Sequence, residues 1–285
     1  MAGLFRRLRQ LRWVGVGEFR RCYVELRNGQ AQLLRAVEAL QDSESENRTL
    51  LRALRRTAAY DRSFTEADPL VSVTIPTWTN HQALAETAIP SVLAQTYKNL
   101  EIVVVGDAAP PETKRSLDSF GDDRIHYFNL PFRGPYPDDP VRRWYVAGVP
   151  AINEAAQLAR GSWIAPLNDD DSFTPDHIEL LLDAARSQRS EVAYGRFVMS
   201  FPDRDPFEHG VYPPVLGKFT WQAAIYHAGL RFFEMELGDA WFDRPGDWSL
   251  CRRMLLAGVR FTMIGDVVVY LYPAGSAKTE ALLGE

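Results

Sequence analysis

The chain has 285 residues, of which 46% are apolar and 24% are charged, as in an ordinary globular protein with one large domain or two smaller ones. Residues 1–66 hold 13 Arg and eight Asp or Glu, whereas residues 67–285 hold 19 Lys or Arg and 29 Asp or Glu, so a basic arm precedes an acidic body. The charge of the body argues against nucleic acid as a partner, because phosphate contacts need dense Lys and Arg.

The chain carries no pattern typical of secretion. Its two cysteines, Cys22 and Cys251, lie far apart, and no apolar run approaches the ~20 residues that span a bilayer. The N-terminus also lacks the apolar core of a secretory signal. We expect a cytoplasmic protein, at most peripheral at the inner face of the membrane.

The arm contains two helical patterns. Residues 3–16 form a basic amphipathic segment, which fits either an anionic membrane surface or the protein's own body. Residues 26–58 carry apolar side chains at helical spacing, interrupted by charges at 42–47, and predict a coiled-coil seam for self-association or for packing on the body. The apolar seam positions are Leu26, Leu33, Val37, Leu40, Leu51, Leu54 and Ala58. Residues 60–68, followed by Pro69, are predicted to form a linker.

Beyond residue 70, strands and helices alternate, which predicts an α/β fold with a mainly parallel sheet flanked by helices. The predicted strands are 71–75, 101–105, 124–128 and 163–167, and the predicted helices are 83–94, 152–160 and 177–186. Ligands of such sheets bind outside the carboxyl ends of the strands. Polar residues follow three of these ends, at Thr77–Asn80, Asp107 and Asn168–Asp171.

Three consecutive carboxylates, Asp169, Asp170 and Asp171, end the fourth predicted strand. Carboxylate oxygens are suitable ligands for Mg²⁺ or Mn²⁺, which often share them with substrate phosphates. The alternative is a solvated cluster that caps the helix beginning after Ser172–Asp176.

Four segments together carry a family resemblance: Val71–Thr77, Ser91–Val105, Leu167–Asp171 and Arg244–Phe261. Residues 70–272 resemble the inverting family-2 glycosyltransferases, which have the Rossmann-like GT-A fold. The resemblance implies a GT-A domain over 67–285, preceded by the helical arm at 1–66.

The resemblance also assigns a donor site. Pro76 and Thr77 correspond to the strand end that contacts the nucleotide base, and Asp107 to the uracil-side carboxylate, with Gly106 replacing a usual Asp. Asn153 lies in the helix before the metal strand, where Ile152 replaces a usual Arg. Arg142 and Arg143 are candidate substitutes for that Arg, or else solvated surface.

The resemblance leaves two registers open for the aspartate cluster. Asn168 replaces the first Asp of the motif, or Asp169 and Asp170 are the working pair. Asp170 is the ligand of Mn²⁺ or Mg²⁺ in both registers, with Asp169 near the ribose or the metal, and Asp171 is expected to cap the next helix.

The last motif assigns the catalytic base to Asp247, which is also a candidate helix N-cap. A sugar hydroxyl needs such a carboxylate to take its proton. The predicted reaction moves a sugar from a nucleotide-diphosphate sugar, with a UDP-sugar favoured, to a hydroxyl of a glycan or lipid-linked acceptor. Trp241 or Trp248 is a candidate to stack on the acceptor.

A second hypothesis is a catalytically degenerate GT-A-like binding or scaffold protein. Gly106, Ile152 and Asn168 depart from the family pattern and favour it. Asp107, Asp170 and Asp247, which keep the pattern, oppose it.

Overall fold

The computed structural model describes residues 23–24, 26–31, 33–34, 37, 44–201, 204–242 and 244–272. The chain divides into two units between Ser43 and Glu44. In the first unit the described residues are helical, and the amphipathic segment 3–16 and Leu40 of the predicted seam lie outside the described residues. Within the described ranges, no helix has both the length and the apolarity that a membrane crossing requires.

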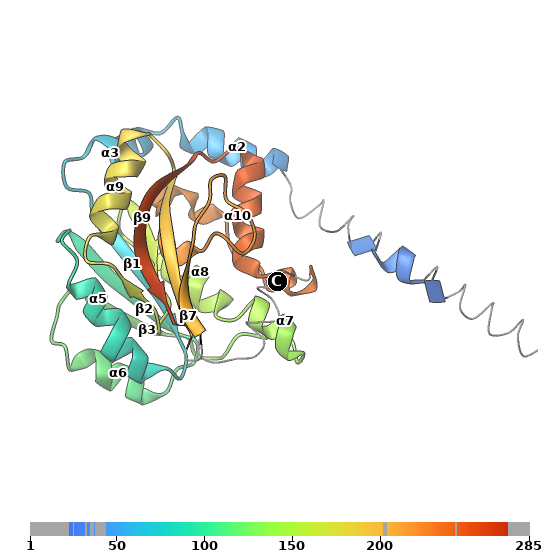
Figure 1. The fold of residues 1–285 in the computed structure, drawn as a ribbon, viewed down its shortest axis with the longest axis horizontal. Helices are drawn as coiled ribbons and strands as arrows, with labels where there is room; N and C mark the ends of the chain where they lie inside the picture. The colour runs from blue at the N-terminus through green and yellow to red at the C-terminus, as the bar shows by residue number, and fades with distance from the viewer. Residues whose placement is uncertain are drawn as a thin grey trace, which may run out of the picture. The chain divides into compact units, whose positions relative to one another are not determined.

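The second unit is a nine-stranded sheet between layers of helices (Figure 1). Its strands are β1 (Val71–Thr77), β2 (Leu100–Gly106), β3 (Ile125–Asn129), β4 (Trp163–Pro166), β5 (Ser172–Phe173), β6 (Val192–Phe201), β7 (Arg204–His209), β8 (Ala224–His227) and β9 (Phe261–Leu271). Its α-helices are α2 (Glu44–Leu54), α3 (Ala58–Thr65), α4 (His81–Ala83), α5 (Ile89–Leu93), α6 (Pro111–Asp118), α7 (Pro140–Tyr145), α8 (Val149–Leu158), α9 (His177–Ser187) and α10 (Gly246–Ala257). A π-helical turn, η1 (Leu84–Ala88), and three 3₁₀ turns, η2 (Trp221–Ala223), η3 (Ala228–Phe232) and η4 (Leu237–Trp241), complete it.

The sheet has a parallel half and a mixed half. The strands run in the order β3-β2-β1-β4-β8-β6-β9-β5, with β7 on β6. The four strands predicted from the sequence pair in parallel as β3-β2-β1-β4. β8 pairs antiparallel with both β4 and β6, and β9 pairs parallel with β6. The prediction of parallel pairing therefore holds for the half that carries the predicted donor residues.

Both faces of the parallel half are covered, which explains its continuous apolar strands. Val73 and Ile75 of β1 belong to the main core with Ile89 of α5 and Leu181 of α9. Val103 of β2 belongs to a second cluster with residues of α8 on the other face. The strand ends are thereby held on a rigid scaffold.

Residues 44–66 belong to the second unit, and their apolar side chains pack on the body, which is one of the two alternatives left open for the seam. Leu51 of α2 is 1% exposed and packs in one cluster with Met254 of α10. Tyr60 and Phe64 of α3 are buried in the main core, so the linker predicted at 60–68 is wrong for its first six residues. The apolar face of this stretch is covered by the chain's own body, which the helical spacing alone could not indicate.

A buried carboxylate fastens these helices. Glu191 has a fully buried side chain and accepts hydrogen bonds from Arg55 Nε at 2.8 Å, Tyr60 Oη at 2.5 Å and the Arg260 backbone nitrogen at 2.7 Å. Burial opposes ionisation of Glu191, but these hydrogen bonds outweigh it and lower its pKa. The ionised Glu191 therefore ties α2 and α3 to the sheet.

Candidate active site

The candidate site lies at the carboxyl edge of the parallel strands. β1 ends at Thr77, which stands opposite Gly106 at the end of β2. The nitrogen of Leu167, just after β4, donates to the Thr74 carbonyl of β1 at 3.0 Å. Parallel strands bring their carboxyl ends to one edge, so the polar residues that follow β1, β2 and β4 lie there together.

Asp169 is joined to the end of β1. Its carboxylate accepts hydrogen bonds from Thr77 Oγ1 at 2.7 Å and from Asn80 Nδ2 at 3.3 Å. Burial raises the pKa of Asp169, and these two hydrogen bonds act against that rise. The strand end thus helps to keep a poorly solvated carboxylate ionised.

Asp170 is next to this carboxylate and has no side-chain partner among the described residues. Burial, and secondarily the charge of Asp169, raise its pKa to about 6. A cation beside Asp169 and Asp170 would lower both pKa values, because it stabilises the ionised carboxylates.

Asp171 does not cap the next helix, contrary to expectation. It is 4% exposed, accepts from the Tyr272 nitrogen at 2.9 Å and from Asn168 Nδ2 at 2.9 Å, and burial raises its pKa to about 7. The N-cap of α9 is Asp176, whose side chain makes no capping bond. Asp171 therefore joins the aspartate loop to the residue that follows β9.

Asp169 and Asp170 are suitable ligands for a hard cation, but they do not complete its coordination shell. Asp169 and Asp170 offer the carboxylate oxygens that Mg²⁺ and Mn²⁺ prefer. Among the described residues, however, no three His, Cys, Asp or Glu side chains form a group that could hold a metal. The remaining ligands would have to be oxygens of a donor phosphate and water.

Asp107 is held by a loop whose role the sequence did not reveal. It is 3% exposed and accepts from the Gly134 nitrogen at 3.0 Å and from Tyr136 Oη at 2.5 Å. Arg133 Nε lies 3.8 Å from its carboxylate, and the Arg133 guanidinium carbon lies 3.2 Å from the ring centroid of Trp78. Trp78, Arg133 and Tyr136 are thus additional candidates on the Asp107 side of the edge.

Gly106 has a steric reason for replacing an aspartate. A Cβ at this position would lie 2.4 Å from Asn129 Oδ1 and 2.8 Å from the Cβ of Ala109. Asn129 is fixed there by two hydrogen bonds with the backbone of Ala109, at 2.8 and 2.9 Å. The asparagine therefore takes the space that a side chain at position 106 would need.

Two other predicted residues have different surroundings. The Asn153 side-chain amide donates to the Met235 carbonyl at 2.8 Å and accepts from the Met235 nitrogen at 3.0 Å. It therefore holds the backbone at Met235, and these bonds involve none of the edge carboxylates. Pro76 lies within β1, opposite Val105, and is partly exposed.

Asp247 lies in the first turn of α10, whose N-cap is Pro245, so the N-cap alternative is wrong. Its Oδ1 accepts from the Trp248 nitrogen at 2.6 Å, and its carbonyl accepts from the Trp221 indole at 2.9 Å. The residue is partly exposed, and burial raises its pKa to about 6. Such a carboxyl group is ionised at neutral pH and is a stronger base than an ordinary aspartate.

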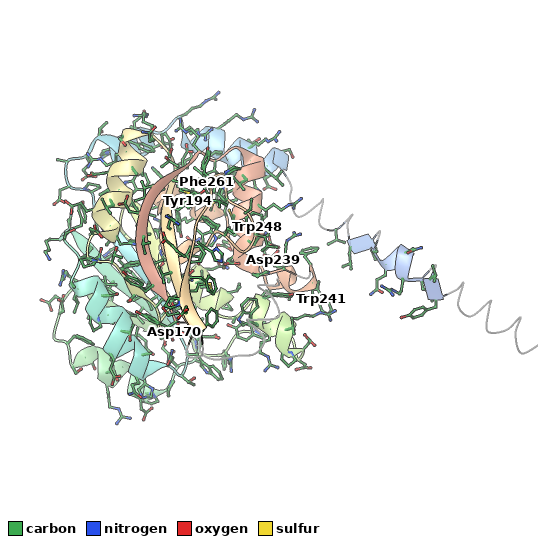
Figure 2. The ribbon with its side chains drawn as sticks, viewed as in Figure 1. Asp170, Tyr194, Asp239, Trp241, Trp248 and Phe261 are labelled. Carbon is green, nitrogen blue, oxygen red and sulfur yellow. The ribbon has the colours of Figure 1, made fainter. Side chains whose placement is uncertain are left out.

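The turn at 145–148 links the strand edge to the start of α10. A Cβ on Gly148 would lie 3.8 Å from the Cβ of Pro76. A Cβ on Gly246, immediately before Asp247, would lie 3.1 Å from the Tyr145 carbonyl oxygen. Figure 2 shows Asp170 near the lower ends of the strands and Trp248 on α10.

Comparison with known proteins identifies the family of this chain. The model of the family described as Glycosyl transferase family 2 matches residues 72–136 and 143–257. A Haloferax volcanii protein named glucosyl-dolichyl phosphate glucuronosyltransferase is 34% identical over 134 residues, 45% of this chain and 38% of that protein. A Campylobacter jejuni protein named GalNAc(5)-diNAcBac-PP-undecaprenol beta-1,3-glucosyltransferase is 31% identical over 126 residues, 44% of this chain and 37% of that protein.

The matched region thus spans less than two fifths of these relatives' own length. Among solved structures, Staphylococcus aureus TarS residues 1–349 in complex with UDP-GlcNAc aligns with a TM-score of 0.55 at 14% identity, over 74% of this chain and 60% of that one. At this identity the likeness concerns the fold, which is GT-A. The chain therefore belongs to glycosyl transferase family 2, a family of glycosyltransferase enzymes.

Proposed function

We propose that this protein is a metal-dependent inverting glycosyltransferase that uses a nucleotide-diphosphate sugar, with a UDP-sugar favoured. The observation that carries the proposal is the aspartate pair Asp169 and Asp170 at the strand edge, together with a turn at 145–148 that approaches Pro76 of this edge and also Gly246, one residue before Asp247. A donor site and a proton acceptor beside each other are what sugar transfer needs.

In the proposed step, Asp247 takes the proton of an acceptor hydroxyl. The hydroxyl oxygen bonds to the anomeric carbon from the side opposite the leaving group, and the bond from that carbon to the diphosphate oxygen breaks. The configuration at the anomeric carbon is therefore inverted, and the nucleoside diphosphate leaves with the bonding electrons.

The donor is proposed to bind with its base toward Asp107 and its diphosphate toward Asp170. Asp107 is an acceptor for an N–H of the base, and Trp78 and Arg133 offer a flat surface beside it. Thr77 and Asp169 are the proposed contacts of the nucleoside, with Asn168 supporting the loop through Asp171.

Asp170, with Asp169, is the proposed holder of Mn²⁺ or Mg²⁺. When bound, the cation supplies Lewis acidity that offsets the charge gained by the leaving diphosphate. The raised pKa of Asp170 is consistent with a carboxylate whose counter-charge comes from a ligand.

The acceptor is proposed to be a hydroxyl of a glycan or of a lipid-linked glycan. The names of the Haloferax and Campylobacter relatives include lipid-linked substrates, which supports this class. A cytoplasmic location, peripheral at the inner membrane face, agrees with such an acceptor and with the basic arm. Self-association through residues 1–43 is a further proposal, which light scattering of chains with and without these residues would test.

The alternative of a degenerate binding or scaffold protein finds some support in the altered residues. Gly106 cannot be replaced by Asp without displacing Asn129, and the Asn168 amide is bound to Asp171. Both hypotheses allow nucleotide binding, but only the enzyme hypothesis requires turnover.

A thermal-shift screen against UDP, GDP and dTDP, each with Mn²⁺ or with EDTA, tests the proposal. A ligand that binds only the native state raises the melting temperature. We expect a rise with UDP and Mn²⁺ that EDTA removes and that Asp170→Asn abolishes. No rise with any nucleotide would contradict the donor assignment, and a rise unaffected by EDTA would contradict the metal assignment.

A further inference from the structure

Arg142 of α7 and Trp241 of η4 form an exposed pair on the α10 side of the molecule. The guanidinium carbon of Arg142 lies 4.3 Å from the ring centroid of Trp241. Trp241 is nevertheless 52% exposed, so the stacked arginine leaves much of the indole open to solvent. Figure 2 places Trp241 at the edge of the molecule, with Asp239 and Trp248 between it and the sheet.

The Arg142 guanidinium has no carboxylate partner among the described residues. The nearby Asp139 accepts from the Arg142 backbone nitrogen at 2.9 Å and serves as the N-cap of α7. The neighbouring Arg143 differs, because it donates to the carbonyls of Pro137 and Asp138 at 3.0 and 2.9 Å. Arg142 therefore keeps hydrogen-bond donors available for a ligand.

The two elements that carry the pair approach the start of the helix that carries the proposed base. Asp239 of η4 is 1% exposed, and its Oδ2 would lie 3.7 Å from a Cβ on Gly246. The carbonyl oxygen of Tyr145, the last residue of α7, meets the same position at 3.1 Å. Because Gly246 has no side chain, α7 and η4 both approach the start of α10, one residue before Asp247. Arg142 and Trp241 are thus held on elements that flank the proposed base.

We infer that Arg142 and Trp241 form an acceptor subsite for a sugar that carries an anionic group. An indole face packs against the C–H face of a pyranose, and a guanidinium pairs with a phosphate or carboxylate through parallel N–H···O bonds. The body carries more Asp and Glu than Lys and Arg, so an anionic acceptor would need such a local cation. The role of the pair as an acceptor subsite rests on the proposed function, whereas the binding of an anionic sugar by the pair does not.

Calorimetric binding of three probes to the full chain tests the inference. The probes are a disaccharide with a reducing-end phosphate, the same disaccharide ending in a uronate, and the neutral disaccharide. We expect at least tenfold tighter binding of one anionic probe than of the neutral one. Preference for the phosphate would indicate a lipid-diphosphate type of acceptor, and preference for the uronate an acidic glycan.

Two variants and a matched control separate the parts of the subsite. Arg142→Gln should remove the anionic preference and leave neutral binding unchanged, whereas Trp241→Ala should weaken all three probes. Arg189→Gln is the control, because the Arg189 guanidinium carbon also lies over an aromatic ring, 5.0 Å from the Phe64 ring centroid, and Arg189 follows the C-terminal end of α9. It should leave binding of all three probes as in the unaltered chain.

Equal affinity for the three probes, or a preference that survives Arg142→Gln, would overturn the inference. Donor turnover is measured on the same preparations. An anionic preference in a chain that neither binds nor turns over a nucleotide sugar would contradict the proposed function and leave the subsite standing.

Discussion

The hydroxyl of Thr77, the last residue of β1, donates a 2.7 Å hydrogen bond to the carboxylate of Asp169, 92 positions later in the chain. This bond joins the end of β1 to the aspartate loop after β4, and it opposes the effect of burial on the Asp169 pKa. It therefore connects the strand pairing of the fold to the electrostatics of the proposed donor site.

Replacing Thr77 by Val should weaken nucleotide binding by at least about tenfold, because a hydrogen bond to a charged group contributes about 1.5–3 kcal/mol. Thr77→Ser keeps the hydroxyl and is the matched control. Titration calorimetry with UDP and Mn²⁺ measures both variants. Equal dissociation constants for Val and Ser would show that the bond does not support the donor site.

Introducing an aspartate at position 106 should destabilise the fold by about 1–3 kcal/mol, the usual cost of overpacking a filled site. The added Cβ would lie 2.4 Å from Asn129 Oδ1. Gly265→Asp is the control, since a Cβ there would meet nothing within 4 Å. Urea unfolding gives the free energies of unfolding.

The same cost should shrink, though not vanish, when Asn129 is replaced by Gly, because the shortest clash is removed while Ala109 Cβ still lies 2.8 Å from the added Cβ. A double-mutant cycle measures this coupling. Additive losses would mean that Asn129 is not the obstacle to an aspartate at position 106.

Much of the fold and part of the site follow from the sequence. The parallel strands were predictable because their apolar runs end in polar residues, and this also located Thr77, Asp107 and Asp169 at one edge. Asp247 was proposed as the base from the family motif around it.

Other contacts depend on distant parts of the chain that no local pattern reveals. Asp171 was predicted to cap α9, but its carboxylate instead accepts a hydrogen bond from the backbone nitrogen of Tyr272, 101 residues away. Arg133 and Trp78 meet across two irregular loops. The helical spacing at Leu51 indicated a buried face but could not tell whether another copy of the chain or its own α10 covers that face.

Replacing Glu191 by Gln should lower the free energy of unfolding by about 1.5–3 kcal/mol, because the buried position would lose its charge-assisted hydrogen bonds. The control is Asp61→Asn, which breaks an ion pair whose two side chains are 64% and 48% exposed and should cost less than about 1 kcal/mol. Similar losses in urea unfolding would contradict the fastening role of Glu191.

The activity should fall on the acid side of about pH 6. Asp247 must be ionised to accept a proton, and burial has raised its pKa to about 6. Below that value, kcat/KM should drop about tenfold per pH unit, with saturating Mn²⁺ keeping Asp170 ionised. Because the folded state binds this proton more tightly than the unfolded state, protonation of Asp247 adds stability as the pH falls through 6. A fall that begins only near pH 4 would contradict the raised pKa.

The most direct measurement is turnover by the Asp247→Asn variant at saturating donor and acceptor, with UDP affinity determined on the same preparation. Loss of the base should reduce transfer by about 10²–10⁴-fold, while the dissociation constant of UDP with Mn²⁺ changes less than about threefold. Turnover equal to that of the unaltered chain would contradict the account, since the proton acceptor would then be another group.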